Sequence, residues 1–451
     1  MRAMRTPTPP VTRASIARSA APIILANASV PLLGLVDTAV IGHYGTTAEL
    51  GALALGALLF NFLYWSFGFL RMSTTGFIAQ ADGAGDEAEV RATLVRALGT
   101  GLVLGLAVML AQWPLASAYF ALMDAGSAVE QSGMAYFQAR IWGAPAALAL
   151  YAFSGALIGL GHGRLLLLVQ LLLNGFNAGL DLYLAGTLGL GARGIGLGTA
   201  LAEWVTCLVA AALLWRLLRA RHRDGTPFLP WPRIADRARL RRMFKANGDI
   251  MVRTLCLLFG FGWFASQGAR LGEATLAANH LLLQLVSFSA FFLDGYAFVV
   301  EALAGGAAGA REPGRFRRVV RLSSELAIAT AALLAAAVWL LGGRVVAALS
   351  SLPDVVAAAT ACLPWVGLYV LLSAPAFQLD GVFIGTTRTR AMRNAAIVSV
   401  LAFVLCAWPA TAAWGNHGLW VAFVAFVVLR AVALAPAYRR LLCEVDGGRT
   451  A

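Results

Sequence analysis

The chain has 451 residues, of which 60% are hydrophobic and only 13% are charged, and its formal net charge is +13. Soluble domains carry about 25% charged residues, so this composition excludes a soluble globular protein and indicates an all-α polytopic membrane protein. The basic residues lie between apolar runs, where membrane topology and anionic headgroups explain them, so we expect no nucleic-acid partner. Five scattered cysteines lack the spacing of a metal or redox site, and we expect no cofactor.

Twelve apolar runs are long enough to cross a bilayer, since a transmembrane helix needs about 20 residues. The connections between them are mostly short. The runs lie near residues 16–43, 51–80, 92–118, 132–160, 164–186, 194–219, 245–269, 274–305, 318–342, 355–385, 391–414 and 417–441.

Arginine and lysine are concentrated in alternate loops. The N-terminal tail and the loop between spans six and seven are strongly basic, whereas the loops of the other side contain only Arg193, Arg270 and Arg344. This asymmetry predicts that both termini are cytoplasmic. The predicted organisation is a tail at 1–15, an N-lobe at 16–219, a basic cytoplasmic linker at 220–243, a C-lobe at 244–441 and a tail at 442–451.

The two halves of the sequence repeat each other. Residues 53–83 align with 276–306 at a constant offset of 223, with ten of 31 pairs identical, and 154–164 align with 380–390 at an offset of 226. A duplicated six-span unit predicts two pseudo-symmetric six-helix bundles related by an axis along the membrane normal. In such proteins the binding site lies between the repeats near the midplane, which is transporter architecture.

The first span contains a carboxylate, Asp37, within the apolar run from Pro22 to Tyr44. An ionisable group at that depth costs about 2.5–3.5 kcal/mol and is usually functional. Pro22 removes a backbone donor, so we expect the helix to bend there. A stripe of small and polar residues at spacings of three and four is expected to face a cavity or other helices: Asn27, Pro31, Gly34, Asp37 and Thr38.

A second intramembrane carboxylate, Asp181, shares a helix face with Asn174 and Asn177 in span five. Thr199 and Glu203 share a face of span six by the same spacing. With Asp37, these residues predict a polar cluster suited to a proton, a Na⁺ ion or a cationic substrate. The alternative for Asp181 is a hydrogen-bonded contact between helices.

The second half carries a different set of charges. Asp249 and Arg253 are four residues apart, which is typical of an ion pair on one helix face. Arg71 and Asp294 are equivalent under the repeat alignment, so they either pair across the halves or face a cavity separately. The residues expected to line a substrate cavity are Asn27, Asn61, Tyr64, Arg71, Ser154, Asp294 and Asp380.

Signals of an enzyme are weak. The GAGD string at 83–86 resembles part of an intramembrane protease motif, but it lies in a polar loop and is better interpreted as a turn. The sequence has no GxSxG, HExxH or P-loop motif. We therefore expect no catalysis, and energy supplied by an ion gradient.

Three segments resemble the DinF branch of the multidrug and toxic compound extrusion (MATE) transporters: PLLGLVDTAVIGHYG, ALGALLFNFLYWSFGFLRMSTTGFIAQADG and, at 378–394, QLDGVFIGTTRTRAMRN. The resemblance covers essentially the whole chain. It implies two six-helix bundles that export a substrate in exchange for H⁺ or Na⁺ by alternating access.

The resemblance also implies roles for particular residues. Asp37, Asn177, Asp181 and Thr199 match the family's first-lobe ion site, which holds H⁺ or Na⁺, and Pro22 matches its bending proline. Another branch has a glutamate in span seven and an aspartate in span ten. This sequence retains the aspartate as Asp380 but has no central glutamate in span seven, which favours coupling in the first lobe.

The resulting hypothesis is a monomeric antiporter of the bacterial inner membrane that exports amphipathic, cationic organic compounds. Its expected partners are these substrates and membrane lipids. The alternative is a lipid-linked precursor flippase of the same superfamily, which would line its cavity with several cationic residues to hold a pyrophosphate. Only Arg71 is an evident candidate for that role in the first half.

Overall fold

The computed structural model describes residues 10–123, 126–223 and 225–447, and within these ranges the chain forms helices and no β-strand. Parts of the predicted tails, including Arg2 and Arg5, lie outside them. Eleven helices of the described ranges are long and apolar enough to cross a membrane, and one of these contains two successive helices. The all-α membrane fold predicted from the sequence is confirmed.

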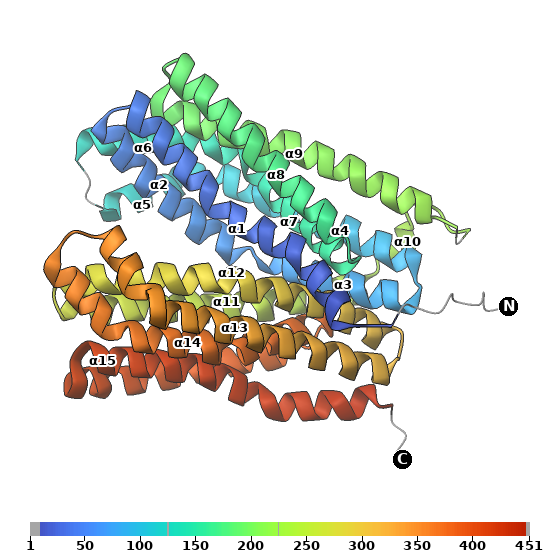
Figure 1. The fold of residues 1–451 in the computed structure, drawn as a ribbon. Helices are drawn as coiled ribbons and strands as arrows, with labels where there is room; N and C mark the ends of the chain where they lie inside the picture. Colours follow the sequence, from blue (N-terminus) through green and yellow to red (C-terminus); the bar gives the residue numbers. More distant parts are fainter. Residues whose placement is uncertain (1–9, 124–125, 224, 448–451) are drawn as a thin grey trace.

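The N-lobe contains the first six spans, drawn from blue to green in Figure 1. Three of these spans are interrupted, because span two consists of α2 and α3, span four of α6, η1 and α7, and span five of α8 followed by the π-helix η2. The bounds are α1 (Arg13–Tyr44), α2 (Thr47–Ser66), α3 (Phe69–Ala84), α4 (Glu87–Leu110), α5 (Gln112–Met123), α6 (Ser127–Arg140), η1 (Ile141–Gly143), α7 (Ala144–Gly159), α8 (Gly163–Asp181), η2 (Leu182–Thr187) and α9 (Gly191–Arg221).

Span three is shorter than the predicted run near 92–118. Helix α4 ends at Leu110, and the chain continues as the separate helix α5. Pro114 explains this end, since a proline ring clashes with the carbonyl group four residues earlier, which here belongs to Leu110.

The C-lobe contains the remaining spans, drawn from yellow to red in Figure 1. The continuous helical segment α15 includes spans eleven and twelve. It breaks at Trp414 (φ −129°) and Gly415 (φ 56°, ψ −136°), where only glycine adopts the second conformation without strain. This break lies between the predicted spans 391–414 and 417–441. The bounds are α11 (Arg237–Arg270), α12 (Glu273–Gly309), α13 (Pro313–Leu349), α14 (Pro353–Gly385) and α15 (Thr389–Val445).

The lobes pack closely at the end of the molecule where α1 begins and α15 ends (Figure 1). A Cβ atom on Gly309 of α12 would lie 2.1 Å from the carbonyl oxygen of Gln80 in α3. The Gln80 side chain donates to the carbonyl oxygen of Gly385 at the end of α14 (3.0 Å). Glycine at such positions lets the backbones of the two lobes approach within contact distance, so this end of the interface is closed.

Equivalent glycines make equivalent contacts in the two lobes. A Cβ atom on Gly155 of α7 would meet Thr74 of α3, and one on Gly381 of α14 would meet Ala297 of α12. Thr74 and Ala297 are themselves equivalent at the offset of 223. The internal repeat is therefore also a repeat of packing, which supports the two pseudo-symmetric bundles.

The linker between the lobes docks on the N-lobe. It contains the short helix α10 (Trp231–Ile234), and Arg233 of that helix donates to the carboxylate of Asp86 at the start of α4 (2.6 Å). Asp236 caps α11 by accepting from the backbone N–H of Ala238 (2.8 Å). Because α9 continues to Arg221 and α11 begins at Arg237, the non-helical part of the predicted 220–243 linker is shorter than the sequence indicated.

Candidate functional site

Four polar side chains predicted from the sequence lie together in the N-lobe. Asp37 of α1, Asn177 and Asp181 of α8, and Thr199 of α9 are all buried, and Asn177 and Asp181 have no exposed surface. Helix α1 packs against α8, and α8 packs against α9. This packing brings residues that are 162 positions apart in the sequence into one cluster.

The amide of Asn177 links the members of this cluster. With its nitrogen toward the carboxylates, it donates to Asp37 Oδ1 (3.1 Å) and to Asp181 Oδ2 (3.0 Å), while its oxygen accepts from Thr199 Oγ1 (3.0 Å). In the opposite orientation Nδ2 donates to Thr199 Oγ1 (3.0 Å), and the Thr199 hydroxyl donates to the carbonyl oxygen of Ile195 (2.9 Å). The first orientation suits charged carboxylates, and the second suits protonated ones that donate to the amide oxygen.

The local backbone makes room for Asp181. A Cβ atom on Gly198 of α9 would lie 2.3 Å from Asp181 Oδ1, so only glycine lets α9 pass this close to the carboxylate. Asp181 is also the last residue before the π-helix η2, and π-helical segments are frequent at functional sites. Both features hold the carboxylate at the meeting point of α8 and α9.

A second polar cluster, formed by Arg140, Tyr136 and Glu203, lies beside the first. The sequence analysis did not identify Arg140. Its guanidinium group donates to the Tyr136 hydroxyl and lies 4.5 Å from the centre of the Phe60 ring. Glu203, which was placed on the same helix face as Thr199, is buried, with Oε2 unpaired among the described residues. An arginine within the predicted fourth span was the signal that could have identified this cluster.

The first span is only partly as expected. Helix α1 runs unbroken from Arg13 to Tyr44 with Pro22 inside it, so Pro22 does not interrupt the helix in this conformation. Of the predicted polar stripe, Asp37 is buried, whereas Pro31, Gly34 and Thr38 are exposed. The stripe therefore does not pack against other helices along its whole length.

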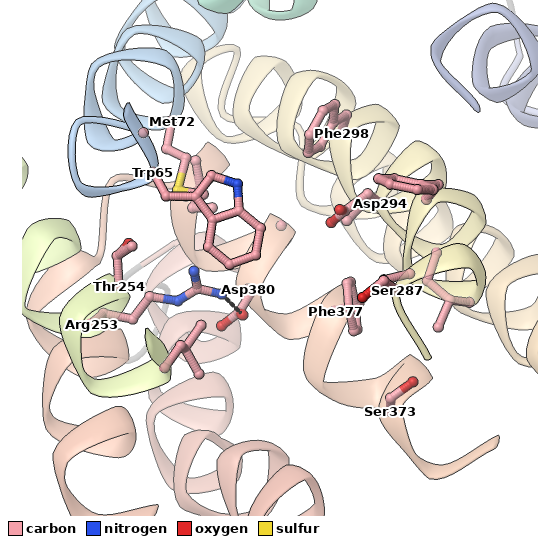
Figure 2. A pocket seen from close by; sticks show the side chains of 18 of the residues that line it. Trp65, Met72, Arg253, Thr254, Ser287, Asp294, Phe298, Ser373, Phe377 and Asp380 are labelled. Carbon is pink, nitrogen blue, oxygen red and sulfur yellow. Dashed lines mark hydrogen bonds and ion pairs between the residues drawn. The ribbon is translucent and has the colours of Figure 1, made fainter. Parts of the chain in front are cut away.

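A cavity of about 380 Å³ lies between the lobes, lined mainly by the C-lobe. Figure 2 shows Arg253 of α11 joined to Asp380 of α14, and Asp294 projecting from α12 on another side of the cavity. Three of the predicted cavity residues line it, namely Arg71, Asp294 and Asp380. Its aromatic lining consists of Trp65, Tyr151, Phe261, Phe291, Phe298, Tyr369 and Phe377.

Asp380 is the centre of a buried charge network. It accepts from Arg253 and from Arg430 of α15 (2.7 Å). The predicted ion pair between Asp249 and Arg253 is therefore wrong, since Asp249 instead accepts from Arg393 (2.7 Å). The physical reason is that buried charges need close partners, and the fold supplies each from another helix: Arg393 and Thr389 of α15 for Asp249, and Asp380 of α14 for Arg253.

Arg71 also pairs differently from the expectation. It donates to Glu301 of α12 (3.2 Å) and not to Asp294, and its guanidinium group lies 3.9 Å from the centre of the Phe298 ring. Both carboxylates lie on α12, and the packing of α3 against that helix brings the guanidinium group to Glu301. Glu301 was missed by the sequence analysis, although an acidic residue inside span eight was a usable signal.

Asp294 is the unpaired carboxylate of the cavity. The lining contains Arg71, Arg253 and Arg430 against Glu301 and Asp380, all of which take part in ion pairs. Asp294 has no hydrogen bond or ion pair with any residue that the structure describes. The cavity therefore holds one carboxylate that is free to face a ligand.

The other residues predicted for a substrate cavity do not line this one. Asn61 is exposed on α2, and Tyr64 packs against Phe60 with ring centres 5.5 Å apart. Asn27 and Ser154 are half-buried on α1 and α7. Amphipathic helices have polar residues on more than one face, so the residue type alone did not identify the face that meets the cavity.

Two six-helix bundles with a cavity between them and buried carboxylates in both lobes are the architecture of a membrane transporter. The family model described as MatE matches residues 22–183 and 250–408. The chain belongs to this family of multidrug efflux transporters, in its DinF branch.

Relatives and solved structures agree with this assignment. The Escherichia coli (strain K12) protein named DNA damage-inducible protein F is 36% identical over 422 residues, which cover 93% of this chain and 91% of that protein. A probable multidrug resistance protein NorM of Xanthomonas axonopodis pv. citri is 26% identical, covering 93% of this chain and 92% of that protein.

Solved structures of lower sequence identity share the fold. A structure described as MATE in the bent conformation has a TM-score of 0.85 at 20% identity and covers 96% of each chain. A MOP superfamily transporter from Pyrococcus furiosus has a TM-score of 0.85 at 18% identity and also covers 96% of each chain.

Proposed function

We propose that this protein is an antiporter of the bacterial inner membrane that exports amphipathic cationic organic compounds in exchange for H⁺ or Na⁺. It works as a monomer in this proposal, with both termini in the cytoplasm and no cofactor besides the transported ion. With that orientation the lobes are closed on the cytoplasmic side.

The observation that carries the proposal is the cluster of Asp37, Asn177, Asp181 and Thr199. Two carboxylates that share one amide at hydrogen-bond distance in a buried site are costly when both are charged and no cation lies nearby. A proton or Na⁺ removes that cost, since carboxylate, amide and hydroxyl oxygens suit either ion. Loading the ion changes which hydrogen bonds Asn177 makes and therefore how α1 and α8 pack.

Helix α1 connects this cluster to the substrate cavity. It carries Asp37, and it also packs on the C-lobe, where a Cβ atom on Gly295 would lie 2.2 Å from Ile24 Cγ1. Ile24 is two residues after Pro22, and Gly295 directly follows Asp294. A change in α1 at Pro22 would therefore move Ile24 against the part of α12 that presents Asp294, which supplies the coupling between ion and substrate.

One side chain of the cavity supports a cationic substrate. The three arginines are balanced by Glu301, Asp380 and Asp294, so the lining is formally neutral, but Asp294 is the carboxylate that makes no ion pair with a described residue. The surrounding aromatic rings suit an apolar body and add cation–π attraction. A pyrophosphate would meet only arginines that already have carboxylate partners, so the flippase alternative has less support.

The test is export in proteoliposomes with the pH gradient and the Na⁺ gradient imposed separately. We expect one gradient to drive accumulation of an amphipathic cation, and Asp37→Asn to lower gradient-driven export by about 5- to 150-fold, the range of typical coupling free energies. Thr38→Ala is the matched control, because Thr38 is the exposed neighbour on the same helix. Full gradient-driven export by Asp37→Asn would refute the proposal, and so would transport of lipid-linked precursors in place of cations.

A further inference from the structure

A second recess, separate from the inter-lobe cavity, lies at the end of the molecule where α1 begins and α15 ends. Its volume is about 740 Å³. The start of α11, the connection between α14 and α15, and both ends of α15 form its walls. Its basic lining residues are Arg242, Lys245, Arg388, Arg390 and Arg440.

The carboxylates of this recess are already engaged. Asp249 accepts from Arg393 (2.7 Å) and from the Thr389 hydroxyl (2.9 Å). Glu444 accepts from Arg388. The recess therefore contains basic side chains in excess of the acidic groups available to neutralise them.

Three of the basic residues have no polar partner among the described residues. Lys245, Arg390 and Arg440 are exposed, and none makes a hydrogen bond or ion pair within residues 10–123, 126–223 and 225–447. They come from three different segments of the chain, and the fold brings them together around one recess. Three unpaired cations around one concave site are suited to a phosphate group.

One side of the recess is apolar and continues along the membrane-facing surface of α15. Val398 lines the recess and is 57% exposed. Leu401 and Leu405 follow at helical spacing and are 58% and 74% exposed. The apolar residues of the recess itself are Phe77, Phe383, Ala391, Ala395, Val398, Ala433, Pro436, Ala437 and Leu441.

We propose that this recess binds one anionic phospholipid of the adjoining leaflet. Lys245, Arg390 and Arg440 hold the phosphate, and an acyl chain lies along Val398, Leu401 and Leu405. The basic and apolar sides of the recess require a ligand that is anionic at one end and apolar at the other. The ligand must also reach the recess from the membrane surface. A phospholipid has this chemistry, and basic recesses between spans on the cytoplasmic side attract such headgroups. The inference does not depend on the transported substrate or ion.

Native mass spectrometry of the full-length protein in detergent tests the proposal with a diacyl phosphatidylglycerol as the probe. We expect one tightly bound lipid. The triple variant Lys245→Gln, Arg390→Gln and Arg440→Gln should weaken it by roughly 10- to 100-fold, since each basic residue contributes several-fold at an anionic surface. The matched control removes three exposed arginines outside the recess: Arg237→Gln, Arg241→Gln and Arg318→Gln.

The control should retain the tightly bound lipid. Equal loss of bound lipid in both triple variants would overturn the proposal, because binding would then follow overall charge. Unchanged lipid binding in the recess variant would also overturn it. A second experiment adds glycerol 3-phosphate as a competitor to the unmodified protein. Its result does not depend on whether the variants fold. If glycerol 3-phosphate displaces the lipid when both are at the same concentration, the recess is a site for free phosphate and the role of the acyl chain is overturned. If it does not displace the lipid, that role is supported.

Discussion

Gly83 of α3 and Gly306 of α12 are equivalent residues of the internal repeat, and they touch each other in the folded protein. A Cβ atom on Gly83 would lie 2.0 Å from the carbonyl oxygen of Gly306. Equivalent positions can meet only on or near the axis that relates the two lobes. This contact therefore marks the axis, and it lies in the part of the interface that is closed.

We predict that Gly83→Ala opens this contact. The added methyl group would overlap backbone, which a flexible side chain cannot relieve, so overpacking should cost the closed interface about 1–3 kcal/mol. Spin labels or cysteine cross-links across α3 and α12 should report separation of the lobes. Gly99→Ala is the control, since a Cβ atom there would have no neighbour within 4 Å; equal cross-linking of Gly83→Ala and unmodified protein would contradict the prediction.

A second prediction concerns the position of Asp181. The methyl group of Gly198→Ala would lie 2.3 Å from Asp181 Oδ1 and should displace the carboxylate from Asn177. We expect gradient-driven export to fall by about tenfold or more, while the amount of folded protein is retained. Gly175→Ala in α8 is the control because it has open space around it. Normal export by Gly198→Ala would show that the position of Asp181 is unimportant.

A third prediction concerns the link through α1. Gly295→Ala would place a methyl group 2.2 Å from Ile24 Cγ1, so α1 and α12 should no longer pack as they do. We expect ion binding to persist while transport is lost, with coupling reduced by about 1–3 kcal/mol. Substrate-dependent proton or Na⁺ release from purified protein measures this directly. Gly262→Ala, which meets no neighbouring atom, should behave as the unmodified protein.

The fourth prediction separates a structural carboxylate from a ligand-binding one. Asp380→Asn leaves Arg253 and Arg430 without their shared counter-charge, so the folded protein should lose about 3–5 kcal/mol. Thermal unfolding in detergent is the measurement, and removing both arginines as well should restore part of the loss. Asp354→Asn, at an exposed position, is the control. An unchanged unfolding temperature for Asp380→Asn would mean that the network does not stabilise the fold.

Asp294→Asn should behave in the opposite way. Because Asp294 has no ion pair within the described residues, its neutralisation should leave the unfolding temperature nearly unchanged. Binding of a cationic substrate should weaken by roughly 10- to 100-fold, the cost of losing one partner of a desolvated charge pair, while a neutral analogue of the same shape should be unaffected. Equal loss for the cation and the neutral analogue would exclude a charge-specific role.

Local patterns in the sequence were sufficient to predict the class of protein and the pairs of residues that repeat. Length and hydropathy of the apolar runs indicate the spans, and the basic loops predict their direction, because both depend on the bilayer and not on which helices are neighbours. The spacing of Asn177 and Asp181 predicted their shared face for the same reason, since helical periodicity is local.

Which charges pair depends on how the helices are arranged in three dimensions. Arg71 could meet Asp294 or Glu301, which both lie on α12. Arg253 could meet Asp249 on its own helix or Asp380 on α14. The packing of α3 against α12 brings Arg71 to Glu301, and the fold places Asp380 of α14 within reach of Arg253 of α11. These choices depend on the relative position of segments more than a hundred residues apart, which no local spacing in the sequence encodes.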